Sequence, residues 1–122
     1  MSHADMPDDI PPLTPAVFHV LLALTGGDRH GYAILKDIQQ RTNGGMKMQA
    51  GTLYGTLQRL LDLGWVDEID PPDDEADARR RYYRLNREGR TAIQTDVQRM
   101  DSLVKLARAA RAARVPLRPK RA

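Results

Sequence analysis

Two short segments of the chain hold the residues best suited to recognition chemistry. The first combines hydrogen-bonding side chains with glycines: Lys47, Gln49, Gly51, Thr52, Tyr54, Gly55 and Arg59. The second, residues 79–84, is an arginine-rich stretch that contains two tyrosines. Neither segment places a nucleophile beside a base, and the three histidines are scattered without metal-ligand spacing. The residue types therefore favour binding through hydrogen bonds and positive charge over catalysis, a metal site or a bound cofactor.

The composition of the 122-residue chain is that of a soluble domain. It has no cysteine, which excludes disulfides and thiolate zinc sites and fits a reducing compartment. No apolar run approaches the ~20 residues that a membrane span needs. Residues 1–12 are acidic and proline-rich, unlike a signal peptide. We expect a cytoplasmic protein with a disordered N-terminal arm over residues 1–12.

Charge is distributed unevenly along the chain. Residues 1–85 contain 9 Lys and Arg against 13 Asp and Glu, a balance of −4, and residues 86–122 contain 10 against 3, a balance of +7. Overall basicity is therefore weak support for a nucleic-acid partner, because both recognition segments lie in the acidic part. The argument depends on how individual residues are arranged.

Hydrophobic periodicity predicts three helices, then two strands, then a long helix. The expected bounds are 15–24, 31–42 and 50–63 for the short helices, 65–69 and 80–85 for the strands, and 87–114 for the last helix. Thr14 before Pro15 is a typical helix start, Gly64 is a typical stop, and Asn86 can cap the last helix.

This order of elements predicts a mainly α fold with a small β-hairpin, namely a winged helix-turn-helix followed by a long C-terminal dimerisation helix. The expected organisation is an arm (1–12), a winged helix-turn-helix DNA-binding domain (13–86), a dimerisation helix (87–114) and a basic tail (115–122).

The helix predicted at residues 50–63 has an inward leucine stripe and an opposite face that is polar and glycine-containing. In a helix-turn-helix the later helix enters the major groove of DNA. Gly51 and Gly55 lie one turn apart on the outer face, and each costs roughly 1 kcal/mol of helix stability relative to alanine. Such glycines are understandable where the backbone must approach a groove closely.

Polar residues of the same segment suit both parts of a DNA duplex. Gln49 and Thr52 offer hydrogen bonds to base edges near the helix start. Tyr54 on the flank, with Lys47 and Arg59, is placed for phosphates, which position a protein without reading sequence. The alternative is an ordinary solvent-exposed face, and it is the better interpretation for Gln58 or Asp62 alone.

The second strand of the hairpin adds a further contact surface. Alternate residues of a strand share a face, and Leu85 marks the core side. Arg79 and Arg80 are therefore the candidates for contacts with the minor groove or the DNA backbone. The alternative is local pairing of these arginines with the acidic run at residues 73–77, which would neutralise the hairpin.

Dimerisation is indicated by two apolar faces. The helix predicted at 15–24 carries Phe18 and Leu22 outside its inward stripe, so it is apolar nearly all round and buried on two sides. The last helix repeats apolar residues at spacings of four and three, as a heptad seam does. The interface residues we expect are Phe18, Leu22, Ile93, Val97, Met100, Leu103, Val104 and Ala107.

Several segments, in order, resemble the PadR family of bacterial transcriptional regulators. The matches are His30-Gly31-Tyr32-Ala33-Ile34, Gly51-Thr52-Leu53-Tyr54 with Leu57, Arg59-Leu60 and Gly64, Arg81-Tyr82-Tyr83-Arg84-Leu85, and Gly89-Arg90. They cover about residues 13–92. Gly55 stands where family members typically have proline, and Leu61 stands where they typically have Glu. The single terminal helix resembles that of the short C-terminal subgroup.

The resemblance implies a winged-helix homodimer that binds double-stranded DNA, with contacts from Thr52, Tyr54 and the wing. Family members usually act as repressors, and some hold small hydrophobic effectors at the dimer interface. We therefore expect a repressor on an inverted-repeat operator, released by an effector if one exists. The alternative is a protein-interaction module that has lost specific DNA binding, as the acidic residues 1–85 suggest.

Overall fold

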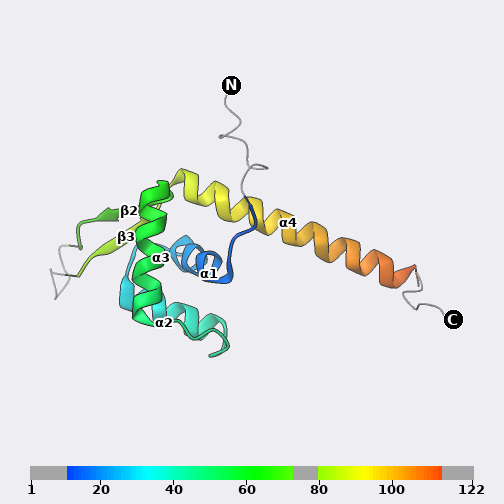
Figure 1. Ribbon diagram of the computed structural model, residues 1–122, viewed down its shortest axis with the longest axis horizontal. Coiled ribbons are helices and arrows are strands. Elements are labelled where there is room, and N and C mark those ends of the chain that lie inside the picture. Colours follow the sequence, from blue (N-terminus) through cyan, green and yellow to red (C-terminus); the bar gives the residue numbers. More distant parts are fainter. Residues whose placement is uncertain (1–10, 73–79, 114–122) are drawn as a thin grey trace, which may run out of the picture.

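A computed structural model describes residues 11–72 and 80–113 of the chain. Its elements are α1 (Pro15–Thr25), β1 (Arg29–His30), α2 (Gly31–Arg41), α3 (Ala50–Leu63), β2 (Val66–Ile69), β3 (Tyr82–Leu85) and α4 (Arg87–Ala112). The short helices and the sheet form the body of the molecule, and α4 extends from it as a long arm (Figure 1). This is the mainly α, winged-helix architecture expected from the sequence.

Some sequence predictions concern residues that the structure does not describe. The expected basic tail at 115–122, the acidic run at 73–77 and Arg79 all lie outside the described residues. Of the expected N-terminal arm, only Pro11 and Pro12 lie inside them.

The predicted helix ends are confirmed by their capping hydrogen bonds. The hydroxyl of Thr14 accepts from the backbone N–H of Val17 at 3.2 Å, and Asn86 Oδ1 accepts from Gly89 N–H at 3.0 Å. Gly64 ends α3 in the left-handed region, with φ of 78°, a conformation that glycine adopts at little cost. The stop at Gly64 explains why the end of α3 agrees with the prediction.

The sheet has three antiparallel strands in the order β1-β3-β2, so the prediction of a two-stranded hairpin was incomplete. Strand β1 pairs Arg29 with Tyr83 and His30 with Tyr82. Two residues are too short to show the alternation that identifies a strand. Strand β1 exists because the fold brings the α1–α2 connection beside the second edge of β3.

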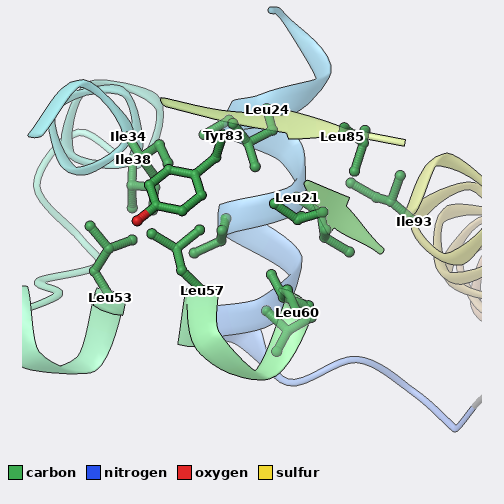
Figure 2. Packing of buried hydrophobic residues seen from close by; sticks show 14 of the residues in the cluster. Leu21, Leu24, Ile34, Ile38, Leu53, Leu57, Leu60, Tyr83, Leu85 and Ile93 are labelled. Carbon is green, nitrogen blue, oxygen red and sulfur yellow. The ribbon is translucent and has the colours of Figure 1, made fainter. Parts of the chain in front are cut away.

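A single hydrophobic core joins α1, α2 and α3 to the sheet and to the start of α4 (Figure 2). Its buried members are Val17, Val20, Leu21, Ala23, Leu24, Ile34, Ile38, Met48, Leu53, Leu57, Leu60, Val66, Tyr83, Leu85, Ala92 and Ile93. Tyr83 and Leu85 both point inward from β3, which confirms the predicted alternation along this strand. Each fully buried leucine contributes about 2 kcal/mol, so this core, more than surface ion pairs, holds the fold together.

The start of α4 is fastened to the body at two places. At Gly89, an added Cβ would overlap the backbone carbonyl oxygen of Trp65 and would approach Leu85 Cδ1 to 2.5 Å, so only glycine fits. At Asp96, a carboxylate only 5% exposed accepts from Leu13 N–H at 3.2 Å and pairs with Arg99 at 2.7 Å. Asp96 thereby holds the segment before α1 against α4.

Ile93 was expected at the dimer interface, but it lies in the core of its own chain and is only 5% exposed. Its side chain points towards the body because this part of α4 packs on α1 and on Leu85 (Figure 2). The exposed part of the predicted seam therefore begins at Val97. Within the described ranges, no helix combines the length and apolarity that crossing a membrane requires.

Candidate nucleic-acid interface

The outer face of α3 is exposed, as its periodicity predicted. Gly51, Thr52, Gly55 and Arg59 are all exposed, whereas the stripe containing Leu53 and Leu57 is buried. A Cβ built on Gly51 or Gly55 would meet nothing within 4 Å. Internal packing therefore gives no reason for either glycine, although each costs roughly 1 kcal/mol of helix stability relative to alanine.

The segment before α3 directs two of the predicted contact residues outward. Met48 is buried against the core, so its neighbours Lys47 and Gln49 are exposed on either side of it. Gln49 occupies the N-cap position of α3, but its side chain makes no capping hydrogen bond. Its amide is consequently available beside Thr52 at the beginning of the helix.

The described arginines of the wing have different surroundings. Arg84 is bound by Asp28, with 2.9 Å between Nη2 and the nearer carboxylate oxygen, and Arg81 lies 3.8 Å from Glu68. Arg80 lies beside His30, with 2.8 Å between Nη1 and Nε2, and over the ring of Tyr32, at 6.0 Å from Cζ to the centroid. Of the two arginines predicted to contact DNA, Arg80 is exposed.

Tyr54 lies on the flank of α3, and its hydroxyl contacts the beginning of α2. A Cβ built on Gly31 would overlap the Tyr54 hydroxyl oxygen and come within 2.7 Å of its Cζ. The Tyr54 side chain is nevertheless 49% exposed, because only one edge of it rests on α2. The absence of a side chain at Gly31 thus determines where the hydroxyl sits.

The fold brings the two predicted recognition segments together. Tyr54 from α3 and Arg80 from the wing line one cavity of about 200 Å³. The other lining residues, His30, Gly31, Tyr32 and Arg81, come from the start of α2 and from the wing. This cavity joins the recognition helix to the wing through the N-terminal end of α2.

Tyr83 on β3 is buried in the core and only 3% exposed. Burial raises the pKa of Tyr83 above its ordinary value of 10.0, and Glu68 and Tyr54 raise this pKa further, whereas Arg81 lowers it. The phenol is therefore uncharged at neutral pH.

Sequence reasoning missed the contribution of α2. His30 caps this helix through Nδ1, which accepts from Ala33 N–H at 3.1 Å. Tyr32, however, is 58% exposed, and two cations lie near its ring, with Lys36 Nζ 5.6 Å and Arg80 Cζ 6.0 Å from the ring centroid. The only signal in the sequence was an aromatic residue four positions before a lysine on a helix.

In the part of the chain that the structure describes, no three or more His, Asp or Glu side chains are grouped so that they could hold an ion. The candidate interface consists of the polar outer face of α3, bordered by cationic and aromatic side chains from the wing and from the start of α2.

Comparison with known proteins identifies the family. Residues 20–95 match the model of the transcriptional regulator PadR-like family. A transcriptional regulator from Clostridium thermocellum is 26% identical, with a TM-score of 0.64, over 76% of this chain and 89% of that one.

Two further solved structures share the fold. A PadR family transcription regulator from Clostridium difficile is 23% identical with a TM-score of 0.67, over 79% of this chain and 97% of that one. The DNA binding of BpsR of Bordetella bronchiseptica is regulated by 6-hydroxynicotinic acid. BpsR is 24% identical with a TM-score of 0.60, over 80% of this chain and 68% of that one. Because the family model covers more than half of the chain and the fold agrees, this protein belongs to the PadR-like family of transcriptional regulators.

Proposed function

We propose that this protein is a sequence-specific DNA-binding repressor that acts as a homodimer on an inverted-repeat operator. Residues 13–86 form its DNA-binding domain and residues 87–114 its dimerisation helix. The observation that supports DNA binding best is the outer face of α3, where Gly51 and Gly55 lie open beside Thr52 and Gln49. A bare helix surface can approach a groove wall closely, and the adjacent polar side chains can reach base edges.

Arg59, Lys47, Tyr54 and the wing arginines serve as backbone contacts in this proposal. Such contacts orient the protein on the duplex and make its affinity dependent on salt. A protein of this kind acts where the chromosome lies, which places it in the cytoplasm.

A homodimer explains the arm formed by α4. Beyond Arg99, every described residue of α4 is exposed, including Met100, Leu103, Val104 and Leu106. An apolar strip of this length on an isolated arm suits pairing with the same strip of a second copy. Phe18 and Leu22 are partly exposed at the margin of the core and could extend that interface.

A small hydrophobic effector is the remaining partner in this proposal. The regulation of BpsR by 6-hydroxynicotinic acid supports the idea that a protein of this fold responds to a small aromatic molecule. In a homodimer, a flat ligand would fit between apolar side chains of α4 and α1.

The test is a binding assay with the DNA upstream of the protein's own gene. We expect retardation of one fragment that contains an inverted repeat, and footprint protection of both half-sites. Thr52→Ala should change the sequence preference, because it removes a hydrogen bond near the helix start. Equal affinity for every duplex at all salt concentrations would contradict sequence-specific recognition.

The second candidate is a protein-interaction module without specific DNA binding. It is favoured by the net acidity of residues 1–85 and by the pairing of Arg81 and Arg84 with carboxylates. Absence of binding to all promoter fragments, together with a stable heteromeric complex, would support this alternative.

A further inference from the structure

Asp96 lies where α4 leaves the body of the molecule. It is the last buried residue of α4, and its neighbour Val97 is already 46% exposed. Of the residues that the structure describes, Asp96 is also the only buried one with a charged side chain. Burying a carboxylate costs free energy unless it is paired and hydrogen-bonded, and an apolar residue often serves stability as well or better. Stability alone therefore gives no reason for a carboxylate at this position.

Two hydrogen bonds converge on Oδ1 of Asp96. This oxygen accepts from Leu13 N–H at 3.2 Å, across 83 positions of the chain, and from Arg99 Nη2 at 2.7 Å on the next turn of α4. The pairing with Arg99 compensates the charge, and the bond to Leu13 reaches out of the helix. Leu13 directly precedes Thr14, the N-cap of α1. Asp96 therefore connects α4 to the beginning of a helix whose buried side belongs to the core.

Two attachments fix the direction of a helix, whereas a single attachment leaves it free to pivot. The first attachment of α4 is at Gly89, where a Cβ would overlap the Trp65 carbonyl oxygen. Asp96 is the second, about 10 Å further along the helix axis. Ala92 and Ile93 pack between these points, but apolar packing is non-directional, whereas a hydrogen bond has a preferred geometry.

The exposed part of α4 magnifies any change in its direction. It continues from Val97 to Ala112, the end of the helix, which is about 24 Å at the rise of an α-helix. A small rotation at Asp96 therefore becomes a large displacement at the far end of the arm.

We propose that Asp96 is a positioning residue that sets the angle between α4 and the recognition helix, and thereby the half-site spacing that the dimer accepts. The inference rests on the proposed function, in which two chains pair through α4 and bind an inverted repeat. In such a dimer, the path from one α3 to the other passes through both bodies and both arms. A change in angle at Asp96 occurs twice along that path, and it shifts the two recognition helices relative to successive major grooves.

Three substitutions separate the hydrogen bond from the charge. Asp96→Ala removes the acceptor and suits a helix, so the arm stays helical but loses its second attachment. Asp96→Leu also lacks an acceptor, fills the buried site with apolar atoms, and should behave like Asp96→Ala even where the alanine variant is too unstable to assay. Asp96→Asn removes the charge but keeps an oxygen that can accept from Leu13 N–H, so it should retain the wild-type geometry.

Asp101→Ala is the matched control on the same helix. It removes a carboxylate from the exposed surface of α4, where Asp101 pairs with Lys105 at 3.0 Å. Sedimentation and circular dichroism check that each variant is a folded dimer.

The first test uses a series of operators whose half-sites are moved together or apart by one or two base pairs. Each base pair rotates a half-site by about 35° around the duplex, given roughly 10 base pairs per turn. The wild type, Asp96→Asn and Asp101→Ala should prefer one spacing over its neighbours by about tenfold, a usual size for coupling between two sites. Asp96→Ala and Asp96→Leu should bind that spacing more weakly and should lose the preference. All variants should bind a single half-site equally, because α3 and the wing are unchanged.

The second test measures the geometry of the dimer without DNA. The chain has no cysteine, so Gln58→Cys on the exposed face of α3 provides one thiol per chain for a spin label. The distance between the two labels, measured by pulsed electron resonance, should have one narrow distribution in this background. Adding Asp96→Leu should broaden the distribution, and adding Asp101→Ala should not.

The outcomes distinguish this inference from the proposed function. Either a wild-type spacing preference or a wild-type label distance in Asp96→Leu would overturn the positioning role and leave the proposed function intact. A uniform loss of affinity at every spacing and at the single half-site would also overturn it, because that is the effect of a destabilised fold. If the wild type is a monomer or binds no inverted repeat, the proposed function fails as well.

Discussion

At the scale of the residue, the glycines of this protein differ in whether packing within the chain explains them. Gly51 and Gly55 face open space, Gly31 borders a half-exposed tyrosine, and Gly89 lies against the backbone of Trp65. Gly55 leaves the outer face of α3 without a side chain at this position. The same substitution, glycine to alanine, should therefore have a different outcome at each position.

Gly55→Ala should stabilise the fold and weaken DNA binding. The added methyl group meets no atom of the protein, so α3 gains about 1 kcal/mol from helix propensity. The same group would stand against the groove wall. Urea denaturation and operator titration measure the two effects, with Ser102→Ala on the exposed part of α4 as the control that should leave affinity unchanged. Unaltered operator affinity of Gly55→Ala would argue against a close groove approach.

Gly89→Ala should destabilise the fold by about 2 kcal/mol, the usual cost of forcing a methyl group into a packed site. The clash is with the carbonyl oxygen of Trp65, which is backbone and cannot swing aside. Chemical denaturation checks the change, with Gly51→Ala as the control, because that methyl group enters open space within a helix. Equal stabilities for the two variants would mean that α4 can shift at no cost.

Tyr83 should make stability depend on pH in the alkaline range. Its pKa in the folded protein is raised, mainly by burial, above the ordinary value of 10.0. The folded state therefore holds its proton more tightly, and this contribution is fully present below pH 10 and is lost as pH rises above it. Comparison of urea unfolding at about pH 8 and pH 10.5 should show a larger fall for the wild type than for Tyr83→Phe. An identical fall in both would exclude the contribution.

At the scale of the element, helix α4 performs two tasks in sequence. Its first turns complete the core through Ala92 and Ile93, and the remainder offers an apolar strip outside the body. The heptad pattern identified the strip but did not show where the core ends. Ile93 and Val97 both fit the heptad spacing. They differ only because Ile93 packs against the body of the same chain.

Val104→Asp should convert the proposed dimer into a folded monomer. Val104 is 45% exposed in a single chain, so the change places a charge in the dimer seam without disturbing the core. Sedimentation at micromolar concentration measures the mass, and circular dichroism confirms the fold. Gln98→Asp adds the same charge to another face of α4 and should remain dimeric. A wild-type protein that sediments as a monomer would contradict the proposal directly.

At the scale of the whole molecule, the proposed DNA-binding face of α3 and the proposed dimerisation arm α4 are different elements of one molecule (Figure 1). Two recognition helices related by a two-fold axis would meet successive major grooves, about 34 Å apart along the duplex. One hydrophobic core includes residues of α3 and of the start of α4 within each half of such a dimer. The spacing of operator half-sites is therefore a property of the whole dimer.

Inserting five base pairs between the half-sites should abolish cooperative binding of the dimer. This insertion rotates one half-site by about half a turn, given roughly 10 base pairs per turn, so the two recognition helices cannot both engage. Titration of matched operators measures the loss, and substituting five base pairs without changing the length is the control. Full affinity for the lengthened operator would indicate that the chain binds DNA as independent monomers.

Much of the architecture and part of the candidate site could be predicted from the sequence. The helix caps at Thr14 and Asn86, the stop at Gly64 and the inward stripe of α3 depend on residues within a turn or two of one another. Short-range patterns record such interactions directly. For the same reason the exposure of Thr52, Gly55 and Arg59 followed from periodicity alone.

The tertiary structure decided what depends on residues far apart in the chain. Strand β1, the contact of Arg80 with His30 fifty positions away, and the seating of Tyr54 on Gly31 all require elements to meet in space. The burial of Ile93 was decided in the same way, because a helix pattern shows which face is apolar but not what covers it. The sequence thus determined the elements and the face of α3, and packing determined that α2 and the wing complete the surface around it.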